Sequence, residues 1–176
     1  IAREGVVVPL ELVVRRDQVR TSSVESARID QHIGWLKIER FQRRTVDEVR
    51  VELRELTASG AALTGLVLDL RGNPGGYLSQ AVSVADIWLD QGPIVSTLDR
   101  VEGTQRDMAR TLGTDSDTEL VVLIDRGTAS AAEIVAGALQ DRARAKVVGQ
   151  SSYGKGSVQQ FFELSDGSAL KLTTAR

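Results

Sequence analysis

The chain has 176 residues, of which 41% are hydrophobic and 26% are charged, and its formal net charge is −2. This composition suits one soluble globular domain with a sizeable core, and it argues against nucleic acid as a partner, because nucleic-acid binding would need clustered lysine and arginine. The absence of cysteine excludes disulfides, thiolate metal sites and a cysteine nucleophile, and no apolar run approaches the ~20 residues of a membrane span.

The first part of the chain predicts a strand, a connection, a second strand and a helix. Residues 6–14 are rich in valine and leucine and are strand-like, whereas residues 15–29 are polar and are predicted to be a connection. Residues 33–38 form a compact strand candidate. Residues 45–48 then begin a helix with a capping box, in which side chains satisfy the free N–H groups of the first turn, and Gly60 suits the end of that helix.

Strand and helix patterns alternate through the middle of the chain. Residues 65–70 are apolar without interruption, which is typical of a strand buried on both faces, and a helix is predicted over residues 78–89. Residues 94–98 and 120–124 continue the alternation, whereas residues 99–117 are polar without a sustained period and are predicted to be an exposed connection. The βαβ series predicts an α/β fold with a mostly parallel sheet and flanking helices.

The last part of the chain predicts a terminal β-hairpin. Two strand-like runs, residues 158–164 and 169–173, flank the turn residues 165–168. Residues 149–155 match the first seven positions of a phosphate-binding P-loop, which is a rival motif. The predicted hairpin weighs against this motif. Gly156 stands where that motif needs a Ser or Thr for Mg²⁺, and no helix is predicted to follow and cradle a phosphate.

Ser130 is predicted to lie at an elbow between the 120–124 strand and a helix over residues 132–139. A hydroxyl at a helix N-terminus lies beside free backbone N–H groups, which can stabilise the oxyanion formed when it attacks a carbonyl. A structural alternative is a capping box, since Glu133 follows three residues later. The elbow alone does not distinguish a nucleophile from a helix cap.

A lysine in the glycine-rich loop 149–156 could serve as the base that a serine nucleophile needs. Lys155 is the only lysine in this loop, and glycines let the backbone fold closely around a side chain that has to be buried. Burial would favour the neutral amine that a general base must be. Ser130 and Lys155 would together form a catalytic dyad.

Other catalytic arrangements have weaker support. His32 is the only histidine, and it precedes a strand in a polar connection, where a surface or capping role is favoured over the base of a Ser-His-Asp triad. Carboxylates alone would have to bind a metal, and they form no calcium-loop pattern, so we expect neither metal nor cofactor. Asp69 and Arg71 are expected to pair and steady the turn after the 65–70 strand.

Three stretches, residues 68–76, 127–134 and 152–159, together resemble the carboxy-terminal processing peptidases, also called tail-specific proteases. They occur in the family's order, and the resemblance runs from Ser23 to the end of the chain. Two positions depart from the family's pattern: Ala132 replaces a usual serine, and Gly72 replaces a usual asparagine.

The resemblance assigns roles to individual residues. It implies that Ser130 is the nucleophile, that Lys155 is the general base, and that Gln159 orients the lysine. The turn over residues 71–76 reads structurally as a simple reversal after a strand. In the family it contributes one oxyanion donor, which the resemblance places at Gly76 with Gly75 as the alternative, and the N–H of Ala131 is the second donor.

The resemblance also implies a crotonase/ClpP-like core and a domain division. Residues 1–22 would be the end of a PDZ domain and its connection, and residues 23–176 a peptidase core that is incomplete at its C-terminus. The implied activity is that of a serine endopeptidase that cleaves proteins near free C-termini through an acyl-enzyme, with the PDZ domain capturing the tail by β-augmentation. Without most of that domain, the isolated piece is expected to be weakly active or inactive.

The resemblance further implies an extracytoplasmic location, and it leaves homo-oligomers and membrane association through segments absent from this chain open. Two other functions share the predicted fold. A catalytically silent scaffold would keep the fold without turnover, and an acyl-CoA hydratase of the crotonase type would need carboxylates near its oxyanion hole.

Overall fold

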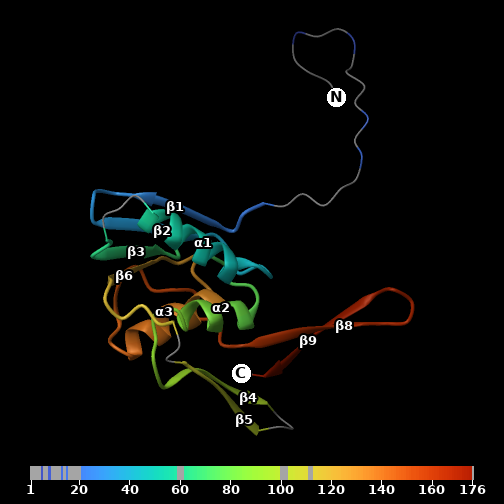
Figure 1. Cartoon of the computed structure of the whole chain (residues 1–176). Helices are drawn as coiled ribbons and strands as arrows, with labels where there is room; N and C mark the ends of the chain where they lie inside the picture. Colours follow the sequence, from blue (N-terminus) through green and yellow to red (C-terminus); the bar gives the residue numbers. More distant parts are fainter. Residues whose placement is uncertain are drawn as a thin grey trace.

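The computed structural model describes residues 5, 8, 13, 15, 21–58, 62–99, 103–110 and 113–175 (Figure 1). The predicted helix end at Gly60 falls outside this part of the chain, as do most of the predicted strand over residues 6–14 and most of the predicted PDZ remnant. No helix in the described residues is long and apolar enough to cross a membrane.

A five-stranded sheet forms the centre of the molecule, in the order β1-β2-β3-β6-β7. The strands β2, β3, β6 and β7 are parallel, and β1 runs antiparallel to β2. The predicted α/β fold with a mostly parallel sheet is therefore confirmed. The strands are β1 (Val24–Arg28), β2 (Ile33–Ile38), β3 (Gly65–Asp69), β6 (Glu119–Ile124) and β7 (Ala145–Gly149).

The prediction that residues 15–29 are a connection is wrong for the part that forms β1. Val24 is buried, and Val24 to Arg28 pair in register with Ile38 to Gly34 of β2. The other side chains of β1 are polar or small and are not buried, as is usual for an edge strand with one solvated face. This pattern resembled a connection because a strand of this kind contributes little apolar periodicity.

Helices α1 (Thr45–Ala58) and α3 (Ala131–Asp141) contact strands of the central sheet, α2 (Leu78–Ala85) contacts both of these helices, and buried residues of all three join one apolar core. Helix α1 begins where the capping box predicted, but Glu48 accepts hydrogen bonds from the N–H and hydroxyl of Ser23, at 2.8 and 2.6 Å. Its carboxylate therefore ties β1 to the helix. Helix α2 is shorter than predicted, and residues 86–88 form turns that bury Trp88. Helix α3 contacts α2 and β7.

A second, antiparallel sheet has the order β5-β4-β9-β8. Its strands are β4 (Pro93–Asp99), β5 (Gly103–Met108), β8 (Val158–Glu163) and β9 (Ala169–Ala175). The predicted terminal hairpin is confirmed as β8–β9, which extends away from the body of the molecule (Figure 1). Among the residues that the structure describes, β4 and β9 pair only between Asp99 and Ala175.

Two predictions for this region need correction. The 94–98 strand exists as part of β4, but it belongs to the second sheet and does not continue the parallel one. The predicted exposed connection over residues 99–117 contains β5, which pairs along β4. Most of the side chains of β5 are exposed, so its sequence lacks the apolar alternation that a half-buried strand would show.

Candidate active site

Ser130 lies at the predicted elbow, between β6 and the first residue of α3. Its backbone has φ 55 and ψ −117, outside the regions that residues with a Cβ ordinarily occupy, and it is one of two non-glycine residues with positive φ in the described chain. Such a conformation costs about 1–3 kcal/mol, and it persists only where the surroundings hold it. The elbow is therefore held in place by its contacts.

The carboxylate of Glu133 provides the most extensive of these contacts. Its Oε2 accepts hydrogen bonds from the Ser130 N–H at 2.6 Å and the Lys155 N–H at 2.9 Å. Its Oε1 accepts from the Ser152 hydroxyl at 2.7 Å and the Gly154 N–H at 2.6 Å. The carboxylate half of the capping box is present, since Glu133 accepts from the Ser130 N–H, and the same carboxylate also joins the elbow of Ser130 to the loop of Lys155.

The environment of Glu133 favours its charged form. Partial burial alone would raise the pKa of this carboxyl group, but the hydrogen bond from Ser152 and those from the backbone N–H groups of Lys155, Gly154 and Ser130 lower it below its ordinary value. The group is therefore a carboxylate at neutral pH, as four hydrogen-bond donors require.

The glycine turn after β3 is tied to the elbow by buried polar side chains. Asn73 is fully buried; its amide donates to the Ile38 carbonyl at 2.8 Å, and its oxygen accepts from the Gly75 N–H at 2.8 Å. Its backbone carbonyl accepts from the Ala129 N–H at 2.9 Å. The turn and the elbow are thereby held next to each other, and a Cβ on Gly75 would lie 2.7 Å from the Ala129 oxygen.

Two further residues bind the same pair of loops. The buried hydroxyl of Thr128 donates to the Leu70 carbonyl at 2.8 Å. Asp125 accepts from the N–H groups of Gly72 and Gly127, at 2.8 and 2.9 Å, and the bond from Gly72 is the main cause of its lowered pKa. The ends of the adjacent parallel strands β3 and β6 are thus cross-linked through side chains.

The expected pair of Asp69 and Arg71 is present at the start of the turn. The Arg71 guanidinium donates to both carboxylate oxygens of Asp69, at 2.9 and 2.6 Å, and Trp35 Nε1 donates to the same group at 3.3 Å. Burial alone would raise the pKa of Asp69, but these hydrogen bonds, chiefly that of Arg71, hold it below its ordinary value. The ion pair steadies the turn, as predicted.

A cavity of about 670 Å³ opens between these loops and the second sheet. All five residues that the resemblance assigns to catalysis lie along it: Gly76, Ser130, Ala131, Lys155 and Gln159. Much of the remaining lining is apolar and comes from both parts of the fold. These apolar lining residues are Phe41, Leu78, Val95, Ile134, Val158 and Phe161.

The structure corrects the expectation that Lys155 is buried. Its loop is held to Glu133 through backbone N–H groups, but the lysine residue is exposed. Within the described residues no hydrogen bond joins the Ser130 hydroxyl to the Lys155 amine, and Gln159 donates from its amide to Thr173 at 3.5 Å. The physical reason is that β8 and β9, which follow this loop, are themselves exposed over most of their length, so they do not bury the lysine.

Several residues that position the site were missed or underestimated from the sequence. Glu133 was noted only as a cap, although its spacing from Ser130 was the available signal. Asn73 was treated as turn chemistry, and Thr128 and Asp125 carried no signal, because their partners lie far away in the sequence. His32 is exposed and its N–H donates to Asp30, so it lies away from the cavity.

The chain belongs to peptidase family S41, and the sequence model of this family matches residues 32–176. It is 40% identical over 180 residues to the carboxyl-terminal-processing protease of Synechocystis sp., covering 100% of this chain and 42% of that protein. It is 42% identical over 178 residues to the carboxy-terminal-processing protease of Bartonella bacilliformis, covering 99% of this chain and 41% of that protein.

A solved structure of a C-terminal processing protease is also similar to this chain. The photosystem II D1 C-terminal processing protease has a TM-score of 0.76 and 34% identity, covering 91% of this chain and 44% of that one. The chain thus spans less than half of the length of each of these three relatives. The resemblance inferred from three motifs is confirmed at the level of the family.

Proposed function

We propose that this chain forms the catalytic core of a serine endopeptidase that hydrolyses proteins near their C-termini. The observation that carries the proposal is that Ser130, Lys155, Gln159 and the two candidate oxyanion donors line one cavity. Membership of a peptidase family and relatives that are C-terminal processing proteases support it.

The proposed reaction begins with proton transfer from the Ser130 hydroxyl to a neutral Lys155 amine. The serine oxygen attacks the peptide carbonyl, and the lysine returns the proton to the leaving amine, which leaves an acyl-enzyme. Water then attacks the ester while Lys155 accepts its proton, and the lysine returns that proton to the Ser130 oxygen as the acid product leaves. A bound peptide that fills the cavity would exclude water from the exposed lysine and so favour its neutral form. Gln159 orients the amine.

The oxyanion of each tetrahedral intermediate is assigned to the N–H groups of Gly76 and Ala131. Gly75 is the less suitable alternative, because it is buried and its N–H already donates to Asn73. Gly76 is exposed and lies on the cavity, while Ala131 is the first residue of α3, where N–H groups have no partner within the helix. Two such donors are the usual arrangement for acyl transfer.

For the whole protein we propose that substrates are proteins with free C-termini, captured by a PDZ domain, and that it acts outside the cytoplasm. The support for the substrates is the family and the names of the relatives, whereas the PDZ domain and the location are what the resemblance of the motifs implies. The alternative is a catalytically silent scaffold on the same fold. The exposure of Lys155 is the observation that favours it.

The test is active-site labelling combined with hydrolysis, on the full-length protein. A fluorophosphonate probe should label Ser130, and tail-tagged peptides should be cleaved. Ser130→Ala and Lys155→Ala should each lower kcat by about 10³-fold or more, and the double variant should be no worse, because nucleophile and base act as a unit. Gln159→Ala should be milder, and His32→Ala should retain full turnover.

Two results would contradict the proposal. Wild-type turnover in Ser130→Ala or Lys155→Ala would eliminate the dyad. A folded full-length protein that neither reacts with the probe nor cleaves any peptide would support the scaffold alternative.

A further inference from the structure

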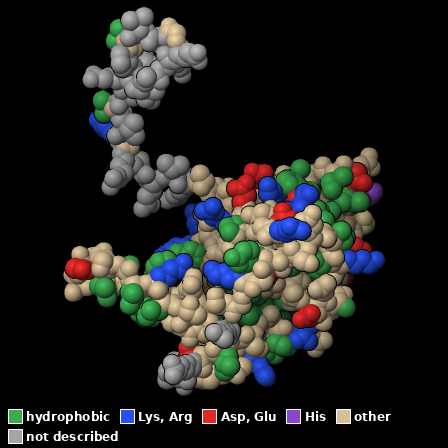
Figure 2. Space-filling model, turned by 180° about the vertical axis from the view of Figure 1, so that it is seen from behind, with side chains coloured by type: hydrophobic (Ala, Val, Ile, Leu, Met, Phe, Trp, Pro, Cys, Tyr) green, Lys and Arg blue, Asp and Glu red, His purple; other side chains and the backbone are tan. Residues whose placement is uncertain are grey.

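The cavity that contains Ser130 has a one-sided charge. Three basic residues line it, Arg40, Lys155 and Lys171, and among the described residues no aspartate or glutamate does. This contrasts with the net charge of −2 for the whole chain. Lys155 is assigned to the chemistry, so Arg40 and Lys171 are two cations for which the proposed reaction has no use. Figure 2 shows lysine and arginine side chains gathered where the β8–β9 hairpin meets the body.

Arg40 is held next to the proposed oxyanion donor by the backbone. The Phe41 N–H donates to the Gly75 carbonyl, and the Tyr77 N–H donates to the Phe41 carbonyl, both at 2.9 Å, so Phe41 forms a bridge alongside Gly76. Phe41 itself is buried, which anchors its neighbour. The side chain of Arg40 is exposed and makes no ion pair with any described residue. Its guanidinium is therefore available to a ligand.

Lys171 approaches the same cavity from the hairpin. It lies on β9 directly opposite Phe161 of β8, and its ammonium lies 5.3 Å from the centre of the Phe161 ring. Both residues line the cavity, and both are exposed. The cation–π contact orients the ammonium without neutralising its charge. Arg40 and Lys171 thus provide positive charge from two separate parts of the fold.

We propose that Arg40 and Lys171 bind a carboxylate of the peptide substrate and determine a preference for acidic substrates. The carboxylate can be an aspartate or glutamate side chain or the free C-terminal group, and an arginine suits either because its planar fork matches carboxylate geometry. The inference rests on the proposed peptidase function, since it names what that same cavity selects. The apolar lining, such as Ile134 and Val95, would accept the neighbouring uncharged side chains.

The test uses four peptides of one sequence that carry Glu or Gln at one position and a free acid or an amide at the C-terminus. Binding is measured on the full-length Ser130→Ala protein by fluorescence anisotropy, and kcat/KM is measured on the wild type. Acidic peptides should bind about five-fold more tightly at low salt, as expected for exposed charge pairs. The preference should disappear at high salt, because the Debye length falls to about 3 Å at 1 M.

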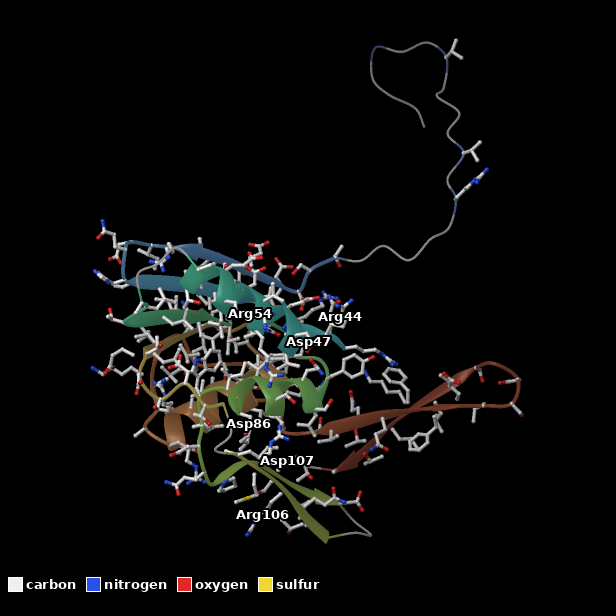
Figure 3. All side chains as sticks on the ribbon, in the orientation of Figure 1. Arg44, Asp47, Arg54, Asp86, Arg106 and Asp107 are labelled. Atoms are coloured by element: carbon white, nitrogen blue, oxygen red, sulfur yellow. The ribbon has the colours of Figure 1, made fainter. Side chains whose placement is uncertain are left out.

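Matched variants identify the residues responsible. Arg40→Gln and Lys171→Gln should each bring the ratio of affinities for acidic and neutral peptides close to one. Arg40→Lys and Lys171→Arg should keep the preference for acidic peptides. Arg54→Gln on α1 (Figure 3) and Lys146→Gln on β7 are the controls, because both residues are exposed and neither lines the cavity. The Glu and Gln peptides separate side-chain recognition from recognition of the free C-terminus.

The outcomes separate this inference from the proposed function. Equal binding of acidic and neutral peptides, or a preference that survives in both glutamine variants, would overturn the inference even if hydrolysis is normal. Loss of hydrolysis with a preference that depends on Arg40 and Lys171 would support the inference and count against the peptidase. Thermal unfolding of each variant verifies that the fold is intact.

Discussion

Ser130 has a positive φ, which is unfavourable for a residue with a Cβ, and contacts with its neighbours hold it in this conformation. Glu133 accepts the hydrogen bond of its N–H, and Ala131 and Ala132, which follow it, are buried with 1% and 0% of their surface exposed. Small residues after the elbow let α3 begin close against the glycine turn, where a larger side chain would not fit. The strained serine is thereby presented to the cavity by a rigid frame.

Glu133 is expected to position the site without touching the substrate. Glu133→Gln keeps the size of the side chain, but it replaces one acceptor oxygen by an amide that cannot accept from N–H donors. In the full-length protein we expect kcat to fall about 100-fold with a smaller change in KM, because displacement of Ser130 relative to Lys155 by ~1 Å is enough for such a loss. Steady-state kinetics with a tail-tagged peptide provides the measurement.

Two variants control this prediction. Ser152→Ala removes one of the four donors and should be milder, and Asp141→Asn, at the exposed end of the same helix, should leave kcat unchanged. A Glu133→Gln protein with wild-type kcat would show that the four hydrogen bonds do not set the geometry of the site.

At the scale of elements, the site is built from the ends of two adjacent parallel strands. β3 and β6 pair in register, and the turn after β3 meets the elbow after β6 through Asn73, Thr128 and Asp125. Loops after parallel strands lie at the same edge of a sheet, which is where such folds place their functional groups. Lys155 comes from the loop that follows the next strand, β7, and completes the row.

The glycine turn can be tested with a pair of matched substitutions. A Cβ on Gly76 would lie 2.1 Å from the Phe41 carbonyl oxygen, so Gly76→Ala has to displace the bridge between the turn and Phe41. We expect a loss of about 3 kcal/mol in the free energy of unfolding and a large loss of activity. Urea unfolding and peptide hydrolysis would measure the two effects.

Gly72→Ala is the control, because Gly72 also has a positive φ, of 72°, but an added Cβ would meet nothing within 4 Å. It should cost only about 1 kcal/mol, the ordinary penalty of a left-handed conformation. Equal stability losses in the two variants would argue against the close contact with Phe41.

For the whole molecule, three carboxylates that accept hydrogen bonds around the site make stability depend on pH. Asp69, Asp125 and Glu133 all have pKa values below their ordinary values of 3.8 for aspartate and 4.5 for glutamate. A group whose pKa is lower in the folded state stabilises the fold above the unfolded pKa and loses this effect as the pH falls through the folded one. All three groups therefore predict that the fold becomes less stable as the pH falls.

We expect the free energy of unfolding to decrease as the pH falls below about 4.5, the range in which these carboxylates become protonated. Urea unfolding at a series of pH values would measure the slope. Glu133→Gln and Asp125→Asn should flatten it, whereas Asp107→Asn, an exposed aspartate on β5 (Figure 3), should leave it unchanged. A free energy of unfolding that stays constant between pH 6 and pH 3 would contradict this assignment.

The local features of the molecule were determined by the sequence alone. The alternation of strands and helices, the terminal hairpin and the elbow at Ser130 follow from periodicity and turn residues within short segments, where neighbours along the chain set the conformation. Three motifs in a fixed order sufficed to indicate the family. The five residues they marked lie along one cavity: Gly76, Ser130, Ala131 and Lys155 follow strands of the central sheet at one edge, and Gln159 comes from β8.

Only the tertiary structure decided how these parts meet. The strands β1 and β5 have mostly exposed side chains and exist because of partners that the local pattern does not show. The exposure of Lys155 and the four hydrogen bonds of Glu133 depend on loops that pack from distant parts of the chain. The bonds that Glu133 accepts from Ser152, Gly154 and Lys155 join residues 19, 21 and 22 positions apart, so no short window of sequence contains both partners.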